Sequence, residues 1–181
     1  MQESQLDTQA YVDVYPELFA KLKAAGWTGK VQQHDKPRWA REASLFVLNM
    51  AALDFIVQFE GLRIEVPSHV GKPGEYPNHC IKFYPGSAFA CMKTSAADYD
   101  LDVEDILEAP DAFPVAESNG NVLFLTQSGR AAFIEQVLSG YARAPNPFVL
   151  LNSFLFNVDS GGLIEYKRGY FGQRITGRPW L

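Results

Sequence analysis

The chain has 181 residues, of which 47% are hydrophobic and 13% aromatic, and its net charge is −5. This length suits one domain with a sizeable core, and the composition excludes an intrinsically disordered protein. Two cysteines are too few for a disulfide framework. Residues 1–9 are polar and unlike a secretory signal, and the apolar stretch 45–59 is shorter than the roughly 20 residues that cross a bilayer. These features predict a cytoplasmic protein that does not enter a membrane.

The first helix is predicted over residues 16–25. Pro16 suits a first helical turn, and Gly26 suits the C-terminal cap. One apolar stripe runs along this segment and consists of Leu18, Leu22 and Ala25. Trp27 follows the cap directly, and we expect it to fold back into the core as an anchor.

A second and longer helix is predicted over residues 39–58. It is apolar on most sides, so we expect it to be the buried central helix. The side chains expected deepest in the core are Phe46, Met50, Leu53 and Val57. Gly61 should end this segment with positive φ, a conformation that other residues adopt at a cost. The alternating residues 62–66 then predict a half-buried strand.

The rest of the chain is predicted to form short strands and two more helices. Pro85-Gly86 is interpreted as the end of a strand, and Asn119-Gly120 is typical of a tight hairpin turn. The predicted strands are 81–83, 113–117, 122–126, 130–137 and 163–166, and the predicted helices are 95–108 and 148–156. This order indicates a single α+β domain with a mixed or antiparallel sheet flanked by helices.

The helix predicted over 95–108 carries an unusual concentration of acids. Between Thr94 and Asp111 there are seven acidic residues and no basic one. At about 100° per residue, these acids share one side of the helix, opposite an apolar arc. An acidic face is typical of a solvated helix surface, but it also repels nucleic acid and favours a basic partner. The candidate binding residues on this side are Asp98, Leu101, Asp102, Glu104, Asp105 and Glu108.

No arrangement of residues in the sequence predicts catalysis, a metal or a cofactor. His69, His79 and Cys80 are close in sequence, but adjacent side chains of a strand point to opposite faces. Metal-binding CxxC or HExxH spacing and a GxSxG nucleophile motif are all missing from the sequence. The basic, aromatic residues 166–180 could stack on nucleic acid, or form a strand that joins the sheet or pairs with a second copy. The acidic chain favours the strand, and these observations together favour a binding protein over an enzyme.

Several short motifs lie at the predicted helix ends, turns and strand entries. Ala25-Gly26-Trp27 ends the first helix, and Phe59-Glu60-Gly61-Leu62 joins the long helix to a strand. The later motifs are Phe83-Tyr84-Pro85, Phe113-Pro114-Val115-Ala116 and Ser128-Gly129-Arg130. The hallmark positions are therefore Gly26, Trp27, Phe59, Gly61, Leu62, Pro114 and Gly129. In the order of these motifs the chain resembles the SUKH superfamily of Smi/Knr-type proteins, and the third subfamily especially, over about residues 15–157. It departs from the glycines of that subfamily at Glu60 and Ala116.

This resemblance implies a sheet flanked by helices, preceded here by a polar lead, 1–14, and followed by a tail, 158–181, with an extra strand. It also implies a bacterial immunity protein that neutralises a cognate polymorphic toxin by direct contact, without catalysis. Many such toxins are nucleases or deaminases, and a nuclease must be basic to hold phosphate, which agrees with the acidic face. We therefore expect a basic toxin as partner, no nucleic acid, and pairing of two copies through the tail as an option. The alternatives are a non-catalytic scaffold or adaptor, and a small-ligand binder or enzyme.

Overall fold

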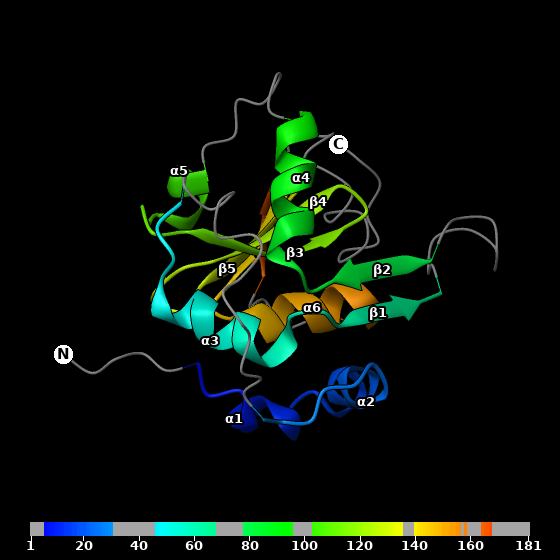
Figure 1. The fold of residues 1–181 in the computed structure, drawn as a ribbon. Helices are drawn as coiled ribbons and strands as arrows, with labels where there is room; N and C mark the ends of the chain where they lie inside the picture. Colours follow the sequence, from blue (N-terminus) through cyan, green and yellow to red (C-terminus); the bar gives the residue numbers. More distant parts are fainter. Residues whose placement is uncertain are drawn as a thin grey trace.

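The fold is described by a computed structural model for residues 6–30, 46–67, 78–95, 103–135, 140–156, 158 and 164–167. Within these residues, six helices and seven strands form an α+β domain (Figure 1). The helices are α1 (Gln9–Val12), α2 (Pro16–Ala24), α3 (Met50–Phe59), α4 (Pro85–Ser95), α5 (Val103–Leu107) and α6 (Pro147–Phe156). The strands are β1 (Arg63–Val66), β2 (His79–Lys82), β3 (Phe113–Ser118), β4 (Asn121–Leu125), β5 (Ala131–Glu135), β6 (Gly140–Ala144) and β7 (Glu165–Lys167). The predicted α+β class with a helix-flanked sheet is confirmed.

The sheet is an antiparallel meander in which each strand pairs with the next one along the chain. Helices α3 and α6 cover one face, α4 and α5 cover the other, and α1 and α2 lie outside α3 and α6 (Figure 1). In β4, Leu123 and Leu125 enter the cluster under α3 and α6, whereas Val122 and Phe124 enter the cluster under α4 and α5. Successive strand residues point to opposite faces, so covering both faces buries every one of these side chains.

The predicted first helix is confirmed as α2, which Pro16 begins. Gly26 has φ 108°, which allows the chain to reverse after the helix. Trp27 is buried, with its ring centroid 5.1 Å from that of Phe19 and 5.9 Å from that of Phe59. The tryptophan is therefore the expected core anchor, and it ties α2 to α3.

The junction between α3 and β1 also has its expected geometry. Gly61 has φ 85°, and its N–H donates to the Phe83 carbonyl oxygen over 2.8 Å. Glu60 has φ −54° and ψ 135°, which any residue adopts, so replacing a glycine there carries no backbone cost. The Phe83 N–H in turn donates to the Leu62 carbonyl oxygen over 3.0 Å, which extends the β1–β2 pairing to the helix end.

The predicted second helix begins later than expected. Residues 46–49 are not helical, and residues 39–45 lie outside the part of the chain that the structure describes. The prediction of the buried face was also wrong, because Met50 is exposed and Phe46, Leu53 and Val57 are only partly buried. The buried side chains of α3 are Ala51, Ala52, Phe55, Ile56 and Phe59.

Asn49 determines where α3 begins. Its side-chain Oδ1 accepts a hydrogen bond from the Ala52 N–H over 2.7 Å, which caps the helix. Its Nδ2 donates to the Asp111 carbonyl oxygen over 2.7 Å and to the Leu125 carbonyl oxygen over 2.9 Å. With an exposed fraction of only 6%, the residue has little access to water. Because the protein itself satisfies its donors and acceptor, the buried amide fixes α3 against the end of β4.

Further differences from the sequence prediction lie on the α4–α5 side. Strand β2 ends before Pro85, as predicted, but Pro85 also begins helix α4, which was not predicted. Proline is accepted there because the first turn of a helix does not use its N–H groups internally. Ser95, the first residue of the predicted helix 95–108, is therefore the last residue of α4. Of that helix, α5 (Val103–Leu107) is described, and residues 96–102 lie outside the described part. Helix α1 and strand β6 were not predicted.

The predicted hairpin turn and the predicted tail strand are confirmed, and the motif residues Gly129 and Pro114 have defined positions in the sheet. Asn119 and Gly120 both have positive φ, 48° and 88°, as a two-residue hairpin between β3 and β4 requires. Gly129, with φ 82°, closes the next hairpin. Pro114 lies in β3, where the pairing register with β4 shifts between Pro114 and Ala116. The predicted tail strand is β7, which pairs antiparallel with β6.

In the described residues no helix has the length and apolar character needed to cross a membrane.

Substituting Gly61 tests the strain at the α3–β1 junction. Apart from the neighbouring residues of the chain, no heavy atom of the described residues lies within 4 Å of a Cβ built at this position, so the cost of a side chain comes from the backbone conformation. We expect Gly61→Val to lower the free energy of unfolding by more than about 1 kcal/mol. Gly61→Asn should cost less, since asparagine tolerates positive φ. Urea denaturation of the two variants measures the difference, and equal losses would contradict the explanation.

Asn49→Asp separates the capping acceptor from the two amide donors. The carboxylate still accepts from the Ala52 N–H but faces two carbonyl oxygens, so we expect a loss of about 2 kcal/mol or more at pH 7. Burial raises the pKa of this new carboxyl above its unfolded value, so the penalty should shrink relative to wild type as pH falls. Asn49→Ser, which keeps only the cap, should show a pH-independent difference. A loss for Asn49→Asp that does not change between pH 7 and pH 4 would exclude the proposed contacts.

Candidate functional site

The acidic segment predicted to bind a partner is only partly described. Asp98, Leu101 and Asp102 lie outside the described residues, and Glu104 is described only as part of the α5 backbone. Asp105 lies in α5 and is exposed. Glu108 was predicted to be helical, but it follows the last helical residue and has φ 53°. The acids therefore do not continue along one helical face as far as Glu108.

Glu108 forms ion pairs with two arginines of the sheet region. Its Oε1 lies 3.0 Å from Arg143 Nη1, and its Oε2 lies 3.4 Å from Arg130 Nη1. The hydrogen bond from Arg143 and the positive charge of Arg143, with a smaller contribution from Arg130, lower the pKa of the Glu108 carboxyl. The carboxylate is exposed, so these pairs stabilise the fold only modestly.

The same arginines hold the C-terminal end of α5. Arg143 Nη1 donates to the Ile106 carbonyl oxygen over 2.7 Å, and Arg130 Nη2 donates to the Glu108 carbonyl oxygen over 3.1 Å. Carbonyl groups at a helix end have no partner within the helix, and positive charge there is favourable. Strand β6 and the turn before β5 thus anchor the acidic helix to the sheet. Glu108 serves this anchor, and its charge is largely balanced within the chain.

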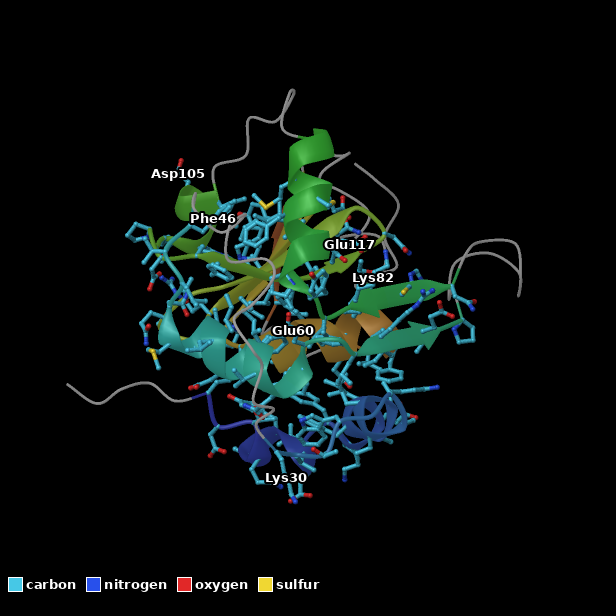
Figure 2. The ribbon with its side chains drawn as sticks, in the orientation of Figure 1. Lys30, Phe46, Glu60, Lys82, Asp105 and Glu117 are labelled. Carbon is cyan, nitrogen blue, oxygen red and sulfur yellow. The ribbon has the colours of Figure 1, made fainter. Side chains whose placement is uncertain are left out.

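Asp111 also has a role within the fold. Its Oδ2 accepts a hydrogen bond from the Gln127 N–H over 3.0 Å, and Gln127 Oε1 accepts from the Met50 N–H over 2.8 Å. These contacts tie the segment before β3 to the β4–β5 hairpin and to the start of α3. Asp105, in contrast, points outward from α5, away from the sheet (Figure 2). Among the described acids of this segment, Asp105 is the one best placed to meet a partner.

A second polar group lies where β2 meets β3, and the sequence analysis did not identify it. Lys82 Nζ lies 3.1 Å from Glu117 Oε2, and the Glu117 side chain is only 10% exposed (Figure 2). The other carboxylate oxygen accepts from the Gly120 N–H over 3.1 Å. The sequence signal was a lone glutamate inside an apolar strand directly before the Asn119-Gly120 turn. This carboxylate closes the hairpin and is already bound on both oxygens.

Cys91 of α4 is close enough to this pair for both charges to affect its thiol. Burial, and then the negative charge of Glu117, raise the pKa of Cys91, while Lys82 opposes the effect. A raised pKa keeps the sulfur as a thiol at neutral pH, and the thiol is a poor nucleophile. The arrangement therefore does not activate Cys91, and its chemistry is that of a packed side chain.

His79 and Cys80 lie on opposite faces of β2, as their adjacency predicts. The His79 ring packs edge-on against Phe154 of α6, with ring centroids 5.5 Å apart. Cys80 faces the other way, toward the charged side chains of Arg63 and Glu65, and burial raises the pKa of its thiol. His69 lies outside the described residues. Within the described ranges, no group of three or more histidine, cysteine or acidic side chains could hold a metal ion.

Comparisons with family models, with curated proteins and with solved structures found no match to this chain.

The low pKa of Glu108 should depend on Arg143. We expect Arg143→Met to raise the Glu108 pKa toward its ordinary range, because the first and strongest stabilising contact of the carboxylate is lost. In the wild type the lowered pKa adds stability at neutral pH, and this is lost as pH falls through the folded-state pKa. Carboxyl NMR titration measures the shift. The control is Lys82→Met, which removes one positive charge beside Glu117 and should leave the pKa of Glu108 unchanged. An equal shift of the Glu108 pKa in both variants would refute a local cause.

Proposed function

We propose that this chain is a bacterial immunity protein of the SUKH kind, which binds and neutralises a basic toxin in the cytoplasm. The observation that carries the proposal is the segment from Thr94 to Asp111, with seven acids and no base, from which Asp105 points outward. Of the acids whose side chains the structure describes, Glu108 and Asp111 have partners within the fold, whereas Asp105 is exposed. A basic partner would relieve the repulsion among them.

The resemblance supports the class of partner. The motifs Ala25-Gly26-Trp27 and Phe59-Glu60-Gly61-Leu62 occupy a capped helix end and a helix-to-strand turn, and the antiparallel sheet flanked by helices is compatible with the family. Two buried polar side chains of the sheet have roles in the fold: Glu117 closes a hairpin, and His79 packs in the core. Action by contact alone, without catalysis, fits this arrangement.

Electrostatic complementarity would act mainly on the speed of capture. Opposite charges accelerate association and leave dissociation less affected, which suits a protein that must intercept a toxin inside the cell that makes it. The effect should weaken with salt, because at physiological ionic strength charges interact over only about 8 Å.

The proposal is tested with the product of the reading frame beside the gene for this chain. We expect that product to stop cell growth when expressed alone, and co-expression of this chain to restore growth through a stable complex of the two purified proteins. A product that is not toxic, or toxicity that the chain does not relieve, would refute immunity. A stable complex with a product that is not toxic would favour the scaffold or adaptor.

The acidic surface has its own matched pair of variants. Asp105→Lys should slow association with the neighbouring product several-fold at low salt and reduce the salt dependence of the rate. Asp13→Lys makes the same change of charge at another exposed aspartate, between α1 and α2, and should have a much smaller effect. Stopped-flow or surface-based kinetics measures both. Identical association rates for the two variants would remove α5 from the binding surface.

A further inference from the structure

We infer that the basic partner docks on an apolar strip formed by Val47, Leu48 and Met50, beside α5. This inference rests on the proposed function and names the surface that would carry it. The described part of the chain exposes six large apolar side chains, and three of them lie within residues 47–50. Their exposed fractions are 73%, 39% and 48% in chain order. Single exposed apolar residues are common, but three together on one fixed segment are a feature of interaction sites.

The strip is held rigidly by the residues around it. Asn49 lies between the exposed side chains, is itself buried, and makes three hydrogen bonds through its side chain. The Met50 N–H is bound by Gln127 Oε1. Phe46, on the other side, packs between the aromatic rings of Phe89, Phe113 and Phe124, with centroids 5.8 to 6.4 Å away. A surface fixed before binding loses little conformational entropy on docking, which favours affinity.

The acidic helix α5, on which Asp105 is exposed, borders the strip and indicates the chemistry of the partner. Phe46 packs in the same cluster as Ile106 and Leu107 of α5, and Asn49 bonds the Asp111 carbonyl oxygen, so the two segments are neighbours. Figure 1 shows this chain segment descending from beside α5 to the start of α3. Binding sites commonly combine a small apolar centre with a polar or charged rim. Here the rim is acidic, and a partner that covers the strip would place basic side chains opposite α5.

A second copy of this chain fits the strip less well. Two identical subunits related by a two-fold axis present the same patch to each other. Such a contact would bring α5 and the acids of each copy close to those of the other, and like charges at an interface are costly. The charge therefore favours a basic partner over self-association.

The strip is tested by kinetics with the purified product of the neighbouring reading frame. In the double variant Val47→Asn, Met50→Gln, we expect the dissociation rate constant to rise about tenfold or more, with association nearly unchanged, because apolar contacts at an interface centre act on dissociation. The control is Val14→Asn, Val158→Gln, which makes the same kind of change at two exposed valines elsewhere. All these side chains are exposed, and equal melting temperatures of the two variants and the wild type would verify intact folds.

Each outcome decides between the surface and the function. If the wild type binds and both double variants dissociate as slowly as the wild type, the strip is not the docking surface, and the proposed function stands. If the wild type does not bind the product, the proposed function fails and this assignment fails with it. Sedimentation velocity tests whether a second copy of the chain occupies the strip instead. If the wild type is a dimer and the Val47→Asn, Met50→Gln variant is a monomer, the strip belongs to a second copy and the inference is overturned.

Discussion

The arrangement of helices on this sheet depends on one buried amide. Phe46, three residues before Asn49, packs against the core clusters on both sides of the sheet. Asn49 lies where the chain then enters α3 on one of these sides. The side-chain oxygen Oδ1 accepts the hydrogen bond that caps α3. The side-chain nitrogen Nδ2 donates to the segment before β3 and to the end of β4. Because a buried polar group without partners costs about 1–3 kcal/mol, these bonds select one position for the helix.

The parts of the fold that were predictable are those that neighbouring residues determine. Gly26, Gly61 and Gly129 stand where the backbone needs positive φ, and the Asn119-Gly120 turn has a specific geometry that few other pairs adopt. Alternation along the β1 segment likewise gives its buried face directly. Such signals do not depend on the rest of the molecule. For this reason the resemblance, which consists of turns and helix ends, could be stated from sequence.

The parts that were missed depend on contacts far along the chain. The apolar run continues on both sides of Asn49, so the helix start follows from partners at residues 111 and 125 that sequence does not place nearby. The same run offers apolar residues at every helical phase, which is why the buried face of α3 was assigned wrongly. Strand β6 was hidden because its inward residues, Ala142 and Ala144, are small. Pro85 was ambiguous, because proline both ends strands and begins helices.

For the candidate site, the count of acids in the sequence gave the sign of the charge but not how much of that charge is available to a partner. Glu108 and Asp111 belong to internal contacts, so the net charge of the segment overstates what a partner meets. Exposed apolar residues were equally hidden in the sequence, since Val47 and Met50 read as parts of a buried helix. The exposure of Val47 and Met50 follows from Asn49, which ends the extended segment and begins α3. The amide that positions the helix also turns these side chains outward, so the docking strip and the core share one structural origin. Selection for binding there would act on the same residue as selection for stability.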